Sequence, residues 1–282
     1  MSAIFGPGGN GDAFVRAGYK SSLDAPLFVK EFGLDAYEYE AGRGLYASEA
    51  MLWSIGANAK ACNVKMSYHT PYFISLSGIE EQVRNKSILY IKESLDAANL
   101  LGAGTIVVHT GSASKITRDE AMRLAADTLM RTLDSVDTYG IKIGLETMGK
   151  KNQLGTLDEV IELCRLSKEL VPVVDFGHLN ARECGGVFIS ADDYLRVFDK
   201  IERLVSPDAA NNLHCHFSKI EWTDKGEKKH LTFEDETFGP DFEPFVEAIS
   251  RGGYSPTVIC ESAGTQAEDA LLMKSKYREI IK

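Results

Sequence analysis

The sequence predicts a single α/β domain, a (β/α)8 barrel that spans residues 1–282. Two observations predict this fold class: short apolar runs recur along the chain, and longer amphipathic segments separate them. Barrels of this kind reach roughly 250 residues as one domain, so the length does not require two domains. Eight runs in 282 residues give 282/8, or about 35 residues per unit, which fits one strand, one helix and their loops.

The eight runs have the length of strands and are mostly rich in β-branched or aromatic residues, as expected of buried parallel strands. In chain order they are Ala3–Gly6, Gly33–Tyr39, Val64–Tyr68, Thr105–His109, Ile141–Glu146, Pro172–Asp175, Leu213–Phe217 and Thr257–Glu261. An open, doubly wound sheet is the main alternative. Such sheets usually carry G-x-G-x-x-G or a P-loop after the first strand, and the segment Gly6–Gly11 (GPGGNG) matches neither.

The segments between the runs have the pattern of helices. Glu80–Leu101 places apolar residues near helical spacing and ends at Gly102, and Arg118–Tyr139 ends in the same way at Gly140. Three capping boxes, in which a hydroxyl and a carboxylate satisfy free amides at a helix start, support this interpretation. They pair Thr117 with Glu120, Thr156 with Glu159 and Thr265 with Glu268.

Composition excludes several classes of protein. Hydrophobic residues make up 44% and charged residues 26% of the chain, so we do not expect disorder, collagen or a coiled coil. The net charge of −10 gives no global attraction to nucleic acid, and phosphate binding would need a local cationic device such as a bound metal. Five cysteines without a C-x-x-C pair are unlike a disulfide framework or a thiolate zinc site.

The chain shows no signal-peptide pattern at its start and no stretch near the ~20 apolar residues of a membrane span. We therefore expect a soluble, cytoplasmic protein without a membrane partner. The sequence makes no prediction of the oligomeric state.

Imidazoles and carboxylates stand at the predicted C-terminal ends of the strands, which a barrel brings together at one mouth. From the third strand to the eighth they are His69, His109, Glu146, Asp175, His214 and Glu261. A carboxylate that ends an apolar run is expensive to bury alone. Imidazole nitrogen and carboxylate oxygen are ligands for Zn²⁺, Mn²⁺ or Fe²⁺. The set exceeds what one ion needs, so we predict a cluster of two or three ions, with Glu146 placed to bridge two.

Three further histidines are candidate ligands. His178 follows Asp175 at a spacing that can place both side chains on one side of a turn. His214 and His216 face the same side of a strand, and the spacing does not decide which of them reaches a metal. His230 follows Lys228 and Lys229 in a segment that we expect to be a long loop.

Five motifs carry a family resemblance: Ser67–Tyr72 (SYHTPY), Val107–Gly111 (VVHTG), Gly144–Thr147 (GLET), Val174–His178 (VDFGH) and Ile259–Glu261 (ICE). In order and spacing they resemble the motifs of endonuclease IV, a family of metal-dependent apurinic/apyrimidinic DNA-repair endonucleases. This family belongs to the wider superfamily of xylose isomerase-like TIM barrels. The resemblance covers nearly the whole chain.

The resemblance implies a cluster of up to three ions, expected to be zinc. His69, His109 and Glu146 would hold the first ion; Glu146, Asp175, the strand-seven histidine and Glu261 the second; His178 and His230 the third. The family has an Asp two residues before the last histidine, where this chain has Lys228. Either His216 compensates for the missing carboxylate, or two ions bind.

The resemblance also implies a substrate, double-stranded DNA with an abasic site, cleaved on the 5′ side of the damage. Glu146 or Glu261 would orient or deprotonate the attacking water. Tyr72 corresponds to a Tyr in the family's DNA-facing loop, and Arg43 lies in the second βα loop, where the family probes the duplex.

A second hypothesis is a sugar isomerase or epimerase of the same superfamily that uses one divalent ion. Glu146, Asp175, Glu261 and one of His214 and His216 would hold that ion, with Glu146 and Glu261 as acid/base groups. Lys228 favours this hypothesis, whereas His69, His109 and His178 together favour the polynuclear nuclease. A metal-binding barrel without activity is a third alternative.

Overall fold

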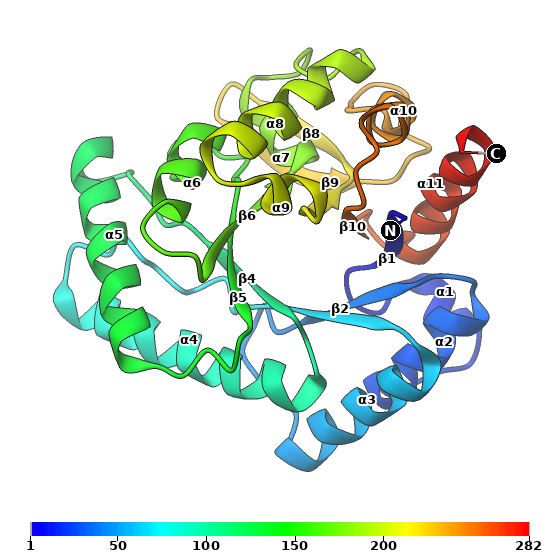
Figure 1. The fold of residues 1–282 in the computed structure, drawn as a ribbon, viewed down its shortest axis with the longest axis horizontal. Coiled ribbons are helices and arrows are strands. Elements are labelled where there is room, and N and C mark those ends of the chain that lie inside the picture. Colours follow the sequence, from blue (N-terminus) through cyan, green and yellow to red (C-terminus); the bar gives the residue numbers. More distant parts are fainter. Residues whose placement is uncertain (1, 282) are drawn as a thin grey trace.

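The computed structural model describes residues 2–281 and has the predicted barrel (Figure 1). Its parallel strands form one sheet in the order β1-β10-β7-β6-β5-β4-β3-β2. They are β1 Ile4–Pro7, β2 Ala36–Glu40, β3 Lys65–His69, β4 Thr105–His109, β5 Lys142–Glu146, β6 Leu170–Asp175, β7 His214–Phe217 and β10 Thr257–Cys260. Each overlaps one predicted apolar run, so the predicted fold class is confirmed and the doubly wound sheet is excluded.

The ring closes between the first and second strands. A parallel bridge joins Gly8 to Glu38, and the amide of Gly9 donates to the carbonyl oxygen of Glu38 at 3.0 Å. The approach needs a glycine at position 6, because a Cβ there would lie 1.8 Å from the carbonyl oxygen of Ala36. The closed ring brings the carboxyl ends of all these strands to one face.

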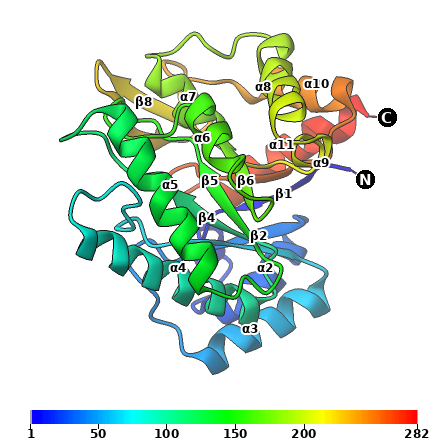
Figure 2. The same cartoon turned by 60° about the vertical axis from the view of Figure 1, so that its left-hand side comes forward.

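Helices form the outer layer around the strands, as the turned view in Figure 2 shows. They are α1 Asp12–Arg16, α2 Ala25–Glu31, α3 Glu49–Cys62, α4 Glu81–Leu101, α5 Arg118–Ser135, α6 Leu157–Cys164, α7 Phe176–Arg182, α8 Ala191–Leu204, α9 Pro207–Asn211, α10 Phe242–Gly252 and α11 Gln266–Ile280, with a 3-10 turn at Ser22–Asp24. Their apolar faces bury side chains against the sheet. In α8, Tyr194 and Phe198 are fully buried, and burying one such side chain contributes about 1.5–3 kcal/mol.

The helix ends confirm one prediction and correct another. α4 ends before Gly102, whose left-handed φ of 67° suits a glycine. α5 ends at Ser135, four residues before the predicted end at Tyr139. The chain becomes extended at Val136 (φ −122°), and the Asp137 side chain accepts the amide of Tyr139 at 2.8 Å, so a turn replaces the last helical turn.

The three predicted capping boxes have different outcomes. Thr156 and Glu159 form the complete box at the start of α6. Thr117 accepts the amide of Glu120 at the start of α5, which is the hydroxyl's half of the box. The box at Thr265 is wrong: no cap hydrogen bond forms at that end of α11 within the described residues, because the Thr265 hydroxyl donates to the Asp269 carboxylate at 2.9 Å instead.

The segment after β7, expected to be a long loop, is a hairpin. Its antiparallel strands are β8 Lys219–Thr223 and β9 Gly226–Leu231, and they form a separate small sheet. Gly226 begins β9 with a left-handed φ of 90°, and a Cβ there would lie 2.2 Å from the carbonyl oxygen of Gly149. The hairpin therefore packs closely on the β5–α6 loop and carries His230 to the barrel mouth.

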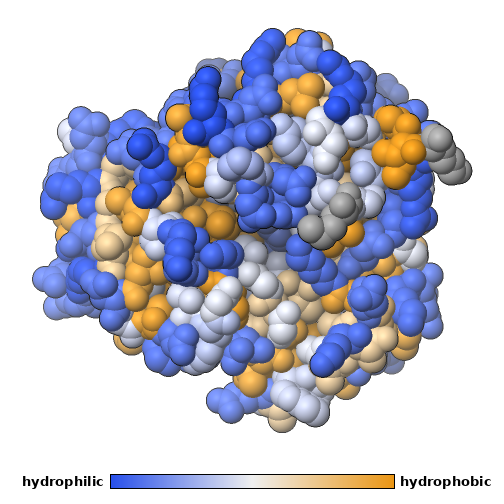
Figure 3. Space-filling view, viewed as in Figure 1, coloured by the Kyte–Doolittle hydropathy of each residue, from blue (hydrophilic) through white to orange (hydrophobic). Residues whose placement is uncertain are grey.

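The state of the cysteines and the polarity of the surface fit what the composition predicted. All five cysteines are free, and Cys164, Cys215 and Cys260 are buried. Hydrophilic side chains cover much of the face shown in Figure 3, with smaller apolar groups between them. None of the helices within residues 2–281 is long and apolar enough to cross a membrane.

Candidate metal centre

Glu146 ends β5 and is surrounded by histidines of other elements. Its Oε2 lies 3.2 Å from Nε2 of His109 and 3.5 Å from Nε2 of His69. Its Oε1 lies 3.1 Å from Nδ1 of His216 and 3.4 Å from Nδ1 of His178. One carboxylate therefore borders two sets of imidazoles, with Oε2 facing His69 and His109 and Oε1 facing His216, which suits a carboxylate that belongs to two ligand groups.

A second group adjoins this carboxylate. Ligand atoms of Glu146, Asp175, His216 and Glu261 all lie within 4.8 Å of one another. Asp175 ends β6, and its Oδ1 accepts the amide of His178 at 2.7 Å, which caps the start of α7. Its buried Oδ2 accepts no hydrogen bond within the described residues. The cap therefore uses one oxygen and leaves the other available to the group.

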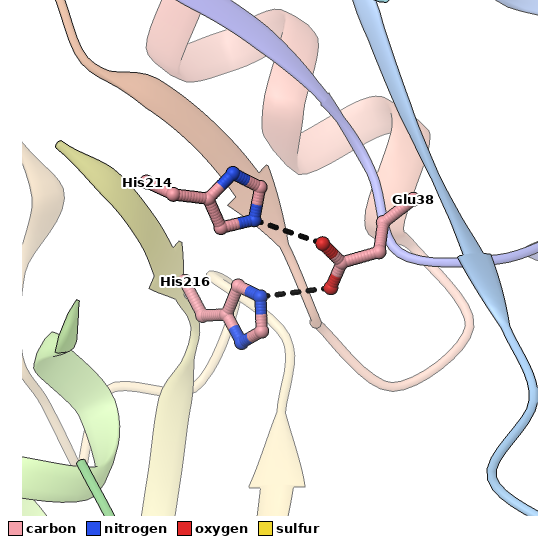
Figure 4. A group of neighbouring side chains, drawn as sticks. All are labelled: Glu38, His214 and His216. Atoms are coloured by element: carbon pink, nitrogen blue, oxygen red, sulfur yellow. Dashed lines mark hydrogen bonds and ion pairs between the residues drawn. The ribbon is translucent and has the colours of Figure 1, made fainter. Parts of the chain in front are cut away.

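The structure distinguishes the roles of His214 and His216, which the sequence spacing could not do. Both Nε2 atoms face Glu38, His214 at 2.8 Å from Oε2 and His216 at 2.8 Å from Oε1 (Figure 4). His216 is level with Asp175 in the neighbouring strand, and its Nδ1 lies 3.4 Å from Glu261. His214 is two residues lower in the barrel, level with Val173. Of the two, His216 lies among the candidate ligands at the mouth.

A third ligand group contains a carboxylate from Glu227, although position 228, where the sequence comparison expected an acid, is a lysine. Ligand atoms of His178, Glu227 and His230 lie within 4.8 Å of one another, with Nε2 of His178 3.5 Å from Oε2 of Glu227. Strand β9 has a bulge: Glu221 pairs with Lys229 and Trp222 pairs with Glu227.

The bulge explains why the carboxylate of the third group was expected at position 228 and is found at position 227. In a regular strand, residues 228 and 230 share a face. The extra residue in β9 gives Glu227 the place beside His230, while Lys228 forms an ion pair with Glu221. The expectation that the third group lacks a carboxylate is therefore wrong.

Most of these ligands line a cavity of about 370 Å³ at the barrel mouth, and Asp175 and His216 lie outside its lining. Tyr72 stands at its edge with 59% of the residue exposed, and a Cβ on Gly42 would contact its ring. Arg43 follows Gly42 in an exposed loop and is outside the cavity lining. The lining also includes residues that sequence analysis did not name, among them Glu40, Lys150 and Gln153.

Mutual contacts shift the pKa values of the central groups. Burial alone would raise the pKa of Glu146, but close contacts with surrounding histidines, His109 first, hold it well below its usual value. Burial alone would lower the pKa of His69, but the carboxylates of Glu40 and Glu146 raise it to about 10. The pKa of His216 is raised well above its usual value against the effect of burial, mainly by Glu261. A bound metal would displace protons from these imidazoles.

The residues fit a divalent metal cluster. Glu146 Oε2 and Asp175 Oδ2 are buried, and neither accepts a hydrogen bond within residues 2–281. A buried polar atom without a partner costs on the order of 1–3 kcal/mol, and more when it is charged. A cation coordinated by these oxygens would remove that cost. Imidazole nitrogens and carboxylate oxygens together are the donor set of Zn²⁺, Mn²⁺ and Fe²⁺.

Most of the side chains that meet here were predictable from the sequence. The structure brings together His69, His109, Glu146, Asp175, His178, His216, His230 and Glu261. It places His214 beside Glu38 below the mouth, and Arg43 outside the cavity. The residues that sequence reasoning missed are Glu38, Glu40 and Glu227. A signal existed for Glu38, because it is a carboxylate within a predicted buried strand.

Comparison with known proteins gives the family. A family model described as a xylose isomerase-like TIM barrel matches residues 27–277. The chain belongs to the xylose isomerase-like TIM barrels. The superfamily that the motif resemblance implied is therefore confirmed.

Two relatives show how far this similarity reaches. An uncharacterised protein of Methanocaldococcus jannaschii is 28% identical over 272 residues, which cover 96% of this chain and 97% of that protein. A probable endonuclease 4 of Acholeplasma laidlawii is 31% identical over 163 residues, which cover 54% of this chain and 52% of that protein. The chain thus spans about half the length of the endonuclease 4 relative that it matches.

Solved structures of xylose isomerase-like barrels share the fold. A D-tagatose 3-epimerase-like protein has a TM-score of 0.71 at 22% identity, over 90% of this chain and 92% of that one. Endonuclease IV from Thermus thermophilus has a TM-score of 0.69 at 19% identity, over 92% of this chain and 95% of that one. At these identities the likeness shows the fold alone, and the family includes enzymes with different substrates.

Proposed function

We propose that this protein is a metal-dependent phosphodiester hydrolase that cleaves double-stranded DNA on the 5′ side of abasic sites. One observation carries the proposal: three ligand groups adjoin one another at the barrel mouth, and Glu146 belongs to two of them. A sugar enzyme with one ion needs a single group. A phosphodiester needs charge neutralisation on several oxygens, which two or three ions supply. The motif resemblance supports the same function.

Three sets of residues in this chain would each hold one ion. His69, His109 and Glu146 would hold one ion, Glu146, Asp175, His216 and Glu261 a second, and His178, Glu227 and His230 a third. Zinc is the expected metal, with Mn²⁺ or Fe²⁺ as alternatives. Bound divalent ions lower the pKa of a coordinated water toward neutrality and neutralise phosphate oxygens, which an acidic protein needs to meet a polyanion.

Glu261 is the best-placed base. Burial raises its pKa well above the usual value, although the nearby His216 opposes the shift, and its carboxylate borders the cavity. Beside the bound ions, this carboxylate would orient the attacking water or take its proton. Tyr72 at the cavity edge would stack on the damaged sugar or a base, and Arg43 in the adjoining loop would contact the duplex.

The test is incubation with an end-labelled duplex that contains one abasic site, using protein with its metal content measured by elemental analysis. We expect cleavage on the 5′ side of the site and no cleavage of the undamaged duplex. A chelator should abolish the reaction. Glu146→Gln and Glu261→Gln should lower the rate by at least ~100-fold in folded protein. Intact abasic DNA after incubation with protein that holds two or more ions would refute the proposal.

A second candidate function, a divalent-metal sugar isomerase or epimerase, is favoured by the size of the cavity. A cavity of about 370 Å³ can enclose a small polar molecule. Glu146 and Glu261 would then exchange protons with the sugar. One ion per chain, together with conversion of ketoses in a substrate panel and inert abasic DNA, would favour this function over the nuclease.

A further inference from the structure

A buried carboxylate below the cavity has no part in the functions proposed so far. Glu38 lies in the middle of β2, and its side chain is completely buried inside the barrel. It reaches across to β7, as Figure 4 shows. A buried ion costs several kcal/mol even in good surroundings, so this residue needs a reason that apolar packing does not give.

In two other histidines of the site, a contact of Nδ1 with a backbone carbonyl orients the ring. Nδ1 of His69 lies 3.0 Å from the carbonyl oxygen of Thr70, and Nδ1 of His178 lies 3.0 Å from that of Thr147. A carbonyl accepts only from a protonated nitrogen, so each contact leaves Nε2 to face a carboxylate of the site. Metal-binding histidines are generally held in this way by a partner on the other ring nitrogen.

His216 has the opposite orientation and a different partner. Its Nε2 lies 2.8 Å from Oε1 of Glu38, and its Nδ1 faces Glu146 at 3.1 Å. The Glu38 carboxylate is itself held, because Oε2 accepts the hydroxyl of Ser67 at 2.6 Å and faces Nε2 of His214 at 2.8 Å. Oε2 is therefore held by two hydrogen-bond partners, and Oε1 is left to its ion-pair contact with Nε2 of His216, which is close but not aligned as a hydrogen bond.

We propose that Glu38 is a positioning residue that keeps Nε2 of His216 protonated and turns Nδ1 toward the ligand group of Glu146, Asp175 and Glu261. The inference rests on the proposed metal centre but not on the proposed DNA substrate. It also explains the position of His214 below the mouth, because His214 and Ser67 both bind the Glu38 carboxylate.

The experiment is a Co²⁺ titration of the full-length protein, followed by the visible absorption of the bound ion. Glu38→Gln keeps the shape of the side chain but replaces one accepting oxygen by a donor. We expect one class of Co²⁺ to bind about 10–100-fold more weakly, with a changed spectrum. Thr257→Val is the matched control, because it removes a partly buried hydrogen bond from Lys65 at a strand position level with His214, and this side-chain hydrogen bond involves neither Glu38 nor a candidate ligand. Its Co²⁺ affinity should stay within about twofold of wild type.

A second readout follows the ring itself. In Zn²⁺-loaded protein with ¹⁵N-labelled histidine, His216 should have a protonated Nε2 and a metal-shifted Nδ1, and Glu38→Gln should lose that pattern. If Glu38→Gln does not fold, Ser67→Ala serves instead, since it loosens Glu38 without removing a ligand, and it should weaken Co²⁺ binding in the same direction.

The possible results separate the two proposals. Wild-type protein that binds no Co²⁺ would overturn the metal centre and this inference with it. Wild-type binding together with unchanged affinity and spectrum in Glu38→Gln, or in Ser67→Ala where that variant replaces it, would overturn the role of Glu38 alone. An equal loss in Thr257→Val would show a general packing defect and would also overturn it.

Discussion

Glu227 and Lys228 are neighbours in the chain but have different partners. The carboxylate of Glu227 lies 3.5 Å from Nε2 of His178, whereas the ammonium group of Lys228 pairs with Glu221 on the other strand of the hairpin. The bulge in β9 decides which of the two stands beside His230. Local backbone geometry, and not residue type alone, therefore determines the composition of the third ligand group.

This difference gives a paired test at the scale of one residue. Glu227→Ala removes a carboxylate from the third group, so we expect that ion to bind at least ~10-fold more weakly. Lys228→Ala removes only an exposed ion pair and should leave the metal content unchanged. Elemental analysis after dialysis against a weak chelator measures both. A lost ion in Lys228→Ala, or full metal content in Glu227→Ala, would contradict the assignment.

Residues at the ends of strands were predictable because apolar runs mark where strands end. That logic located Glu146, Asp175 and Glu261 and the histidines level with them. Glu38 was missed because it lies inside a strand, although the cost of burying a lone carboxylate applies to it as well. Glu227 was missed because a bulge leaves no mark in the spacing of residues.

Among the helical elements, α8 has a start that sequence analysis did not predict. The Asp193 carboxylate accepts the amide of Ser190 at 2.8 Å, the hydroxyl of Ser190 at 2.8 Å and the amide of Ile189 at 3.1 Å. These hydrogen bonds, those of Ser190 first, lower the pKa of Asp193 from 3.8 to about 2. The ionised carboxylate therefore stabilises the folded state.

The lowered pKa predicts a pH-dependent effect. A carboxyl group whose pKa is lower in the folded state contributes stability above its unfolded pKa, and that contribution is lost as the pH falls toward about 2. Asp193→Asn should lower the free energy of unfolding at pH 7 by about 1 kcal/mol, allowing for solvent screening. The difference from wild type should shrink as the pH falls below about 4. Urea unfolding at pH 7, 4 and 3 measures it.

Asp192→Asn is the control for this element, since it removes the same charge from the same turn. Asp192 pairs with Arg251 and makes no cap hydrogen bond among the described contacts. Its effect should be within about 0.5 kcal/mol at every pH. Equal losses in the two variants would mean that charge near the helix start, and not the cap, provides the stability.

Strands were easier to predict than helix ends or the hairpin. Buried parallel strands need continuous apolar runs, and these are visible without a partner. The end of α5 depended on a turn at Asp137, which competes with the helix for the same amides. In the hairpin after β7, charged residues interrupt β8 and dominate β9, so it lacks the apolar run that identified the others.

At the scale of the whole molecule, the candidate centre joins parts of the chain that are far apart in sequence. Its ligands come from β3, β4, β5, β6 and β7, from the residue after β10, and from α7 and the β8–β9 hairpin. The barrel was predictable from repetition along the chain, and its closure makes these strand ends converge. The negative charge of several carboxylates gathers there, and either metal ions or protonated imidazoles must offset it.

Metal removal should therefore destabilise the entire barrel. Ions that bind the folded protein and not the unfolded chain stabilise it by about 4 kcal/mol when their concentration is 1,000 times the Kd. For a chain of this size, each kcal/mol corresponds to about 2–4 °C, so chelation followed by dialysis should lower Tm by about 10 °C, and added Zn²⁺ should restore it.

Calorimetry of metal-loaded and metal-depleted protein measures the shift. In Glu146→Gln the shift should be smaller, because the shared carboxylate is gone. An unchanged Tm in protein whose metal loss is confirmed by elemental analysis would show that the ligands do not hold the strands together through bound ions.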